Sequence, residues 1–203
     1  MKKRTFCIFG LILVGALVFF LPNYNSLTKW FNYNLTGKAD EIPSREIELG
    51  QIGTEKSEHQ PDRIKIPKIG IDAPVIYNSG ISEQEIVENL NNGVVFYNNS
   101  DLPSESGLAI YFGHSSNYWW RPGQYDTVFS LIPELTAGDQ IDVYYGDQGY
   151  IYQATDKKVI NQQAWSQLQH PQIKNGLALV TCWPLGTTWR RYVVWAEKIP
   201  IQP

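Results

Sequence analysis

The sequence has little net charge and few sulfur-containing residues. It contains 17 Lys and Arg against 20 Asp and Glu, which gives a formal net charge of −3. Nucleic-acid binding needs a concentration of positive charge, so no nucleic-acid partner is expected. Methionine occurs once, whereas there are seven Trp and twelve Tyr. This aromatic composition favours a strand-rich domain.

Cysteine and histidine are also scarce. Two cysteines are too few for a framework of several disulfides. The two cysteines are Cys7, inside an apolar run near the N-terminus, and Cys182, near the C-terminus. We expect them on different sides of a compartment boundary, where they cannot pair. No cluster of metal-ligating residues is evident, and no cofactor is expected. Cys182 is then an unpaired thiol, and such a thiol is either reactive or joined to another molecule.

The first 22 residues predict a membrane anchor. Residues 2–4 are basic, and residues 6–21 (FCIFGLILVGALVFFL) are apolar and uncharged. This run is slightly short for a hydrocarbon core of about 30 Å, but flanking residues and bilayer thinning can compensate. Because no small-residue cleavage site follows, we interpret it as an uncleaved transmembrane helix rather than a removed signal peptide. The preceding positive charges place the N-terminus in the cytoplasm and the rest outside the cell membrane, so the lipid bilayer is an expected partner.

The chain divides into three parts. Residues 1–22 form the cytoplasmic tail and anchor, and residues 23–60 are polar without sustained periodicity, as in an extracytoplasmic linker. A short helix is predicted at residues 44–49 within this linker. Residues 61–203 form the folded domain, and no internal repeat is present.

The folded domain is predicted to be mainly β. Ser82 and Glu85 have the spacing of a capping box and predict a helix over residues 82–90. The sequence GDQG at residues 146–149 indicates a hairpin turn. Short strands with one or two short helices indicate a closed or nearly closed β-barrel. The predicted strands are residues 63–67, 71–77, 94–97, 108–112, 141–145, 150–159, 177–181 and 192–199.

Three residues at predicted strand ends could carry chemistry. His114 follows the apolar strand 108–112, Cys182 follows the strand 177–181, and the pair Arg190–Arg191 precedes the last strand. A thiol at its free pKa is mostly protonated at neutral pH, so it needs an activating group. An imidazole can take its proton, and a guanidinium can stabilise the oxyanion that forms when a thiolate attacks a carbonyl.

Taken singly, each of these residues has an ordinary structural explanation. An isolated Cys at a strand end is more often a small buried apolar residue than a nucleophile. Most histidines are surface or structural residues, and His59 and His170 fit that description. An Arg-Arg pair before a strand usually lies on a solvated edge. Only the combination indicates catalysis.

The combination resembles a known family. From about residue 63 to 199 the chain is similar to a sortase domain, in which a catalytic His follows a Gly and a Thr-Leu-x-Thr-Cys strand lies near the C-terminus. Residues 178–182 (ALVTC) match that motif at Leu, Thr and Cys, with Ala178 replacing the first Thr. Residues 191–196 (RYVVWA) are similar to the family's arginine strand. The order His, Cys, Arg and the N-terminal anchor agree as well.

The resemblance implies a closed eight-stranded β-barrel and a cysteine transpeptidase. Cys182 would be the nucleophile, His114 the general acid and base, and Arg191 the oxyanion donor. Thr181 would help to form the substrate pocket. Trp183, which is not part of the family motif, is a further candidate for substrate binding. The substrates would be surface proteins or pilins bearing a sorting signal similar to LPXTG, cleaved between Thr and Gly. The acceptor would be an amine of a cell-wall precursor or a pilin lysine. Some relatives bind calcium, but the sequence places no such site here, and no cofactor is expected.

Alternatives follow from the same residues. The Trp-rich residues 118–123 and Trp183 could line a substrate groove or pack loops onto the barrel. A non-catalytic surface β-barrel could bind peptide or glycan through such loops. Papain-like hydrolases place Cys before His, and cysteine L,D-transpeptidases need a His-Gly-Cys type motif that is absent here. Glu83, Glu85 and Glu88 are expected to form a solvated helix face.

Overall fold

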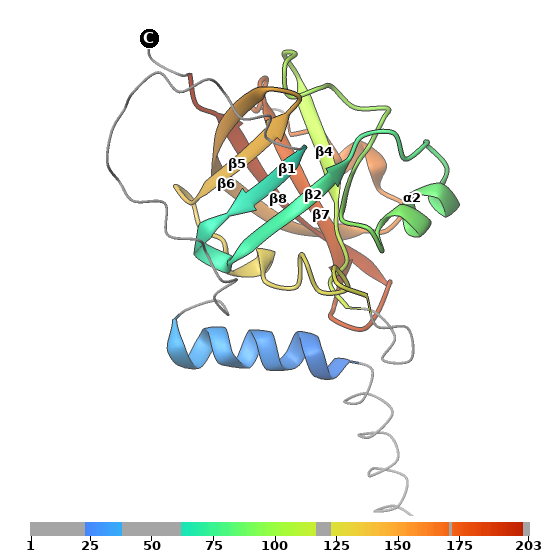
Figure 1. Cartoon of the computed structure of the whole chain (residues 1–203), viewed down its shortest axis with the longest axis vertical. Coiled ribbons are helices and arrows are strands. Elements are labelled where there is room, and N and C mark those ends of the chain that lie inside the picture. The colour runs from blue at the N-terminus through green and yellow to red at the C-terminus, as the bar shows by residue number, and fades with distance from the viewer. Residues whose placement is uncertain (1–22, 38–61, 117–122, 171, 201–203) are drawn as a thin grey trace, which may run out of the picture.

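Eight strands form a closed barrel in the computed structural model of the chain (Figure 1). The structure describes residues 23–37, 62–116, 123–170 and 172–200. The barrel order is β1-β2-β3-β4-β7-β8-β6-β5. The predicted mainly β fold class and closed barrel are therefore confirmed. The strands are β1 Arg63–Ile66, β2 Ile71–Ile76, β3 Val94–Phe96, β4 Leu108–Phe112, β5 Gln140–Tyr145, β6 Gln148–Asn161, β7 Gly176–Trp183 and β8 Arg190–Lys198.

The helix α2, Glu83–Asn89, forms where the capping box predicts it. The Ser82 hydroxyl accepts a hydrogen bond from the Glu85 backbone N–H at 3.3 Å. The Glu85 carboxylate accepts one from the Ser82 backbone N–H at 3.1 Å. These reciprocal bonds satisfy donors that the first helical turn otherwise leaves without partners. The described residues also include three short 3-10 helices: η1 Pro67–Ile69, η2 Ile132–Glu134 and η3 Trp165–Leu168.

Two hydrophobic clusters explain why the sequences of β4 and β7 are continuously apolar. Ala109 and Tyr111 of β4 and Leu177 and Leu179 of β7 belong to the cluster that fills the barrel. Their neighbours along each strand belong to a second cluster, which α2 and η3 cover from outside. Since successive side chains point to opposite faces of a strand, both faces of β4 and β7 are buried. The outer cluster includes Ile86, Ile110, Phe112, Leu168, Ala178, Val180, Val193 and Trp195.

The strand β7 is longer than its apolar pattern predicts. The sequence predicts a strand ending at Thr181 followed by a loop, but β7 continues through Trp183. Cys182 pairs with Arg191 and Trp183 pairs with Arg190 in the antiparallel ladder with β8. Backbone pairing with β8 sets where the strand ends, and apolar patterning does not report it. Cys182 therefore lies inside a strand.

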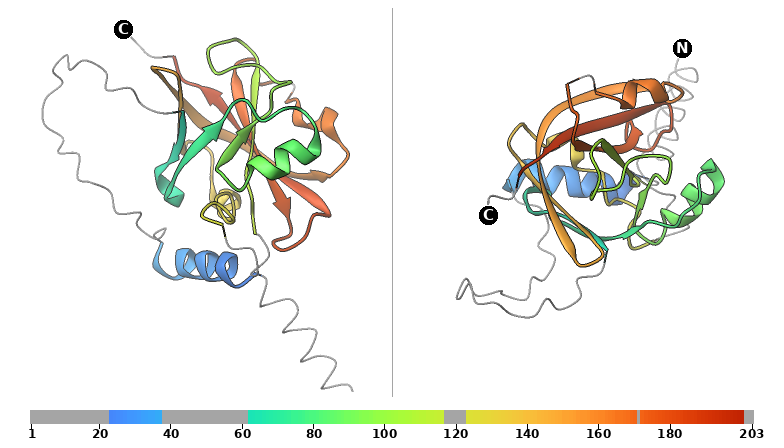
Figure 2. Two further views of the ribbon diagram at one scale, coloured as in Figure 1. Left: turned by 45° about the vertical axis from the view of Figure 1, so that its right-hand side comes forward. Right: turned by 90° about the horizontal axis from the view of Figure 1, so that it is seen from above.

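Residues 23–36 form a helix that lies against one end of the barrel (Figures 1 and 2). The sequence predicts only a polar linker for this stretch. The Ser26 hydroxyl donates to the Ser115 carbonyl at 2.8 Å, and the Trp30 indole N–H donates to the Glu134 carboxylate at 3.0 Å. Tyr33 packs against the barrel cluster. These contacts join the helix to the loop that follows β4 and to η2.

The predicted anchor at residues 6–21 and the predicted helix at residues 44–49 lie outside the described residues. Within the described ranges, no helix has the length and apolar character needed to cross a bilayer.

Candidate active site

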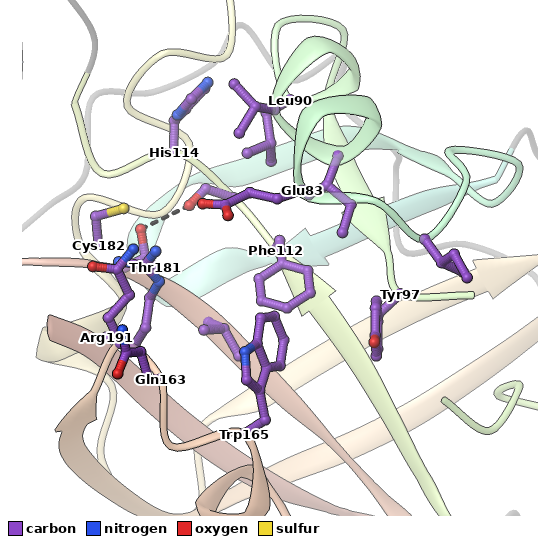
Figure 3. A pocket seen from close by; sticks show the side chains of 16 residues that line it. Glu83, Leu90, Tyr97, Phe112, His114, Gln163, Trp165, Thr181, Cys182 and Arg191 are labelled. Carbon is purple, nitrogen blue, oxygen red and sulfur yellow. Dashed lines mark hydrogen bonds between the residues drawn. The ribbon is translucent and has the colours of Figure 1, made fainter. Parts of the chain in front are cut away.

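The thiol, the imidazole and the guanidinium predicted from the sequence line one pocket, in which the His114 ring points away from Cys182 (Figure 3). His114, Cys182 and Arg191 all line a cavity of about 280 Å³ on the outside of the barrel (Figure 3). Strand alternation places Cys182 and Arg191 on the outer face, because Val180 and Val193 of the outer cluster lie two positions away on the same strands. His114 lies in the loop after β4, two residues beyond Phe112.

The strand ladder sets Cys182 beside Arg191. The two residues are direct partners across the β7–β8 pair. The Arg191 Nη1 group donates to the carbonyl oxygens of Thr188 at 3.0 Å and Arg190 at 3.2 Å. These bonds hold one end of the guanidinium, which carries five N–H donors in all. Arg190 is exposed and is not among the residues that line the pocket. Of the two adjacent arginines, the structure therefore brings Arg191 to the pocket, as predicted.

Thr181 ties the cysteine strand to the histidine loop. Its side chain is only 3% exposed, and its hydroxyl donates to the carbonyl of Gly113 at 2.7 Å (Figure 3). The Gly113 N–H in turn donates to the carbonyl of Val180 at 3.1 Å. Thr181 also lines the pocket. These two bonds fix the backbone immediately before His114 against the backbone immediately before Cys182.

Apolar and aromatic side chains form the rest of the pocket wall. Tyr97 stacks on Trp165 at a ring-centroid distance of 5.7 Å, and both rings meet Phe112 edge-on at 5.8 Å. Ile86 and Leu90 of α2 line the same cavity. An apolar wall beside a thiol suits a peptide segment with apolar side chains next to the bond under attack. Sequence reasoning did not single out these residues, although Phe112 precedes Gly113–His114 directly.

Glu83 is exposed, as expected for a residue on a solvated helix face, and it also lines the pocket. Its carboxylate extends from α2 toward Cys182 and Arg191 (Figure 3). Among the residues described, it is the only acidic side chain lining this pocket. The available signal was helical spacing, because Glu83 precedes Ile86 and Leu90 by three and seven residues and so shares their face.

Trp183 is not among the residues that line the pocket. It follows Cys182 on the same strand and therefore points to the opposite face. There it packs against Tyr192 with ring centroids 5.2 Å apart. For Trp183, the structure thus favours packing over substrate contact. The Trp-rich residues 118–122 lie outside the described residues.

A comparison with family models decides what kind of site this is. Residues 64–199, well over half of the chain, match the model of the sortase domain. The chain belongs to the sortase family. Sortases are cysteine transpeptidases, so the alternative of a non-catalytic binding barrel is not favoured. The family resemblance drawn from the His, Cys and Arg motifs is confirmed.

Individual sortases show the same relationship in sequence and fold. The chain is 27% identical over 169 residues to Sortase D of Bacillus subtilis, covering 82% of this chain and 73% of that protein. It is 25% identical over 137 residues to Sortase A of Bacillus anthracis, covering 68% and 59% respectively. Sortase C1 of Streptococcus agalactiae shares the fold with a TM-score of 0.55 at 24% identity, over 89% of each chain. The Sortase D5 transpeptidase of Clostridium perfringens does so with a TM-score of 0.53 at 24% identity, over 68% of this chain and 78% of that one.

Burial favours the neutral forms of both candidate catalytic groups in this sortase. Burial lowers the pKa of His114 below its ordinary value of 6.5, and the Asp126 carboxylate opposes this shift. Burial raises the pKa of Cys182 above its ordinary value of 9.0. Arg191 acts against that rise, whereas Glu83 adds to it. At neutral pH the site therefore holds mainly a thiol and an uncharged imidazole, and a proton must move between them before the sulfur can attack.

The pH dependence of Cys182 alkylation should report these charges. In the free enzyme, we expect the rate of reaction with iodoacetamide to rise through a pKa above 9.0, because only the thiolate reacts. Glu83→Gln removes a negative charge and should move the rise to lower pH. Glu88→Gln changes a residue of the same helix that does not line the pocket, so its profile should match the wild type. Identical profiles for all three proteins would contradict the electrostatic role of Glu83.

Loss of the Thr181 hydroxyl should destabilise the site. Thr181→Val keeps the shape of the side chain but leaves the Gly113 carbonyl without its donor. The expected cost is about 1–3 kcal/mol in the free energy of unfolding, measured by chemical denaturation. Thr181→Ser retains the hydroxyl and should lose much less. Equal stabilities of the Val and Ser variants would show that this hydrogen bond contributes nothing.

Proposed function

We propose that the protein is a membrane-anchored sortase that cleaves a C-terminal sorting signal similar to Leu-Pro-x-Thr-Gly between Thr and Gly. The acyl group then passes to an amine of a cell-wall precursor or a pilin lysine. The observation that carries the proposal is the convergence of Cys182, His114 and Arg191 beside an apolar pocket wall. The apolar wall suits the Leu and Pro side chains of such a signal. With these side chains on the wall, the Thr carbonyl of the signal would lie at the Cys182 thiol.

The first half-reaction forms a thioester. His114 takes the proton from Cys182 Sγ, and the resulting thiolate attacks the carbonyl carbon of the signal's Thr. The carbonyl oxygen becomes an oxyanion, which the Arg191 guanidinium stabilises. The intermediate collapses with cleavage of the C–N bond, and the imidazolium of His114 gives its proton to the leaving Gly amine.

The second half-reaction transfers the acyl group. A neutral acceptor amine attacks the thioester carbon, and His114 accepts a proton from the amine nitrogen. The carbon–sulfur bond then breaks, an amide forms, and Cys182 leaves as a thiolate that His114 reprotonates. The free enzyme is restored. In each half-reaction, Cys182 and His114 exchange one proton with each other and with the reacting amine. A neutral thiol and a neutral imidazole hold this single proton at rest, so the neutral resting forms of Cys182 and His114 suit the cycle.

The proposed location is the cell membrane, with the N-terminus in the cytoplasm and the barrel outside. The basic residues 2–4 and the apolar residues 6–21 support it. The proposed partners are surface proteins or pilins that carry a sorting signal.

Product analysis tests the proposed reaction. The enzyme is incubated with a peptide containing Leu-Pro-Ala-Thr-Gly and an excess of an amine acceptor, and the products are identified by mass. We expect release of the Gly-containing fragment and a new amide between Thr and the acceptor. A peptide scrambled in order should not react. Cleavage at another bond, or hydrolysis that never responds to acceptor concentration, would contradict the proposal.

A further inference from the structure

The helix formed by residues 23–36 carries stripes of different character. One stripe faces the barrel, where Ser26, Trp30 and Tyr33 make the contacts with the loop after β4, with η2 and with the barrel cluster. These residues are separated by four and three positions, so they lie on one face of the helix. Contact with the barrel therefore explains the residues on only one side of this helix.

A second stripe is apolar and exposed. Tyr24, Phe31 and Leu35 are 66%, 57% and 69% exposed, and their separations of seven and four positions place them on one line. At 1.5 Å per residue the line is about 16 Å long. Single exposed apolar residues are common on protein surfaces, but an aligned set on one helix indicates a contact surface. The next stripe around the helix is polar and exposed; it consists of Asn25, Asn32 and Thr36.

The position of this helix in the chain identifies what covers the apolar stripe. The helix begins at Asn23, two residues after the end of the apolar run 6–21. Sixteen residues in a helix span about 24 Å, which is less than the roughly 30 Å of a hydrocarbon core. With residues 6–21 as the proposed anchor, a helix that begins two residues later would start at the membrane surface.

We propose that Tyr24, Phe31 and Leu35 insert into the interfacial layer of the lipid bilayer and hold the barrel against the membrane. The inference rests on the membrane anchor included in the proposed function. Aromatic residues favour this layer, and helices with one apolar stripe lie in its plane. A second copy of the chain is a poorer occupant, because a stable dimer buries about 800 Å² per partner and three side chains supply far less.

This arrangement places the active site near the lipid. Ser26, in the first turn of the helix, donates to Ser115, the residue after His114. A side chain at Gly186, in the loop after Cys182, would collide with Asn23. The loops that follow both candidate catalytic residues thus rest on the end of the helix nearest the anchor. A substrate held in the same membrane would reach Cys182 without leaving its surface.

Fluorescence quenching by lipid tests the inference in the full chain. Cys7→Ala and Cys182→Ala remove the native thiols, and Phe31→Cys or Asn32→Cys adds one for an environment-sensitive dye. Each protein is reconstituted into vesicles of phosphatidylglycerol and phosphatidylethanolamine that contain a lipid with a shallow spin label. The spin label should quench the dye at position 31 several-fold more than at position 32, and the difference should persist at high salt. Leu35→Cys should behave like Phe31→Cys.

The other outcomes overturn the proposal in distinguishable ways. Equally weak quenching at positions 31 and 32, in protein that floats with the vesicles, would place the apolar stripe in water. Protection of position 31 from aqueous iodide without lipid quenching would assign the stripe to a protein partner. Failure of the chain to float with vesicles would overturn the anchor as well. Since these proteins lack Cys182, the result does not depend on whether the proposed reaction occurs.

Discussion

Cys182→Ala should lose peptide cleavage and transfer almost completely, by a factor on the order of 10⁶ in kcat. Among the described residues Cys182 is the only thiol, and no other pocket residue can form the thioester. Cys182→Ser should be inactive too, because a hydroxyl is far harder to deprotonate than a thiol. Rates are measured with a sorting-signal peptide under saturating conditions.

The fold should survive the loss of the sulfur. Cys182 is only partly buried, and its backbone pairing with Arg191 does not involve the side chain. We therefore expect a thermal midpoint close to that of the wild type. His114→Ala should lose nearly as much activity as Cys182→Ala, and the double variant little more, because residues of one catalytic unit are not additive. Transfer that persists in a folded Cys182→Ala protein would refute the mechanism.

Arg191→Ala should reduce kcat/KM by about 10² to 10³, the usual cost of removing one oxyanion donor. Arg191 lines the pocket and lies across the ladder from Cys182. Loss of its charge should also raise the pKa of Cys182 further, because Arg191 now opposes the effect of burial. Arg191→Lys should recover only part of the loss, since a point charge does not reproduce the planar guanidinium.

Arg190→Ala is the matched control for this prediction. Arg190 has the same side chain on the same strand, but it does not line the pocket. Its loss should change kcat/KM much less than the loss of Arg191, with both variants measured on one peptide. A large deficit in Arg190→Ala together with a near-normal Arg191→Ala would show that the oxyanion donor has been assigned to the wrong arginine.

The elements that depend on local patterns could be predicted from the sequence. The reciprocal spacing of Ser82 and Glu85 predicts where α2 begins, because the capping bonds form within one turn. Gly146 and its neighbours predict the tight β5–β6 hairpin, in which Tyr145 pairs with Gln148. Strand alternation predicts which of two adjacent arginines faces the site.

Features that depend on tertiary pairing could not be predicted in this way. The position of Cys182 within β7 follows from its ladder with β8, and the apolar pattern ends at Thr181. The helix at residues 23–36 is joined to the barrel partly by hydrogen bonds from Ser26 and Trp30, which hydrophobic periodicity does not detect. The place of Glu83 in the pocket depends on how α2 packs next to β3 and against the outer cluster, to which it contributes Ile86 and Leu90.

The central claim is that Cys182 forms a thioester with a sorting-signal peptide, and the intact mass of the protein tests it most directly. The enzyme is mixed with a peptide containing Leu-Pro-Ala-Thr-Gly without an amine acceptor and quenched in acid, where thioesters persist. We predict an added mass equal to the peptide up to and including Thr, located on Cys182 by digestion and released by an amine. An unmodified protein during continuing peptide cleavage, or an adduct on any other residue, would contradict the account.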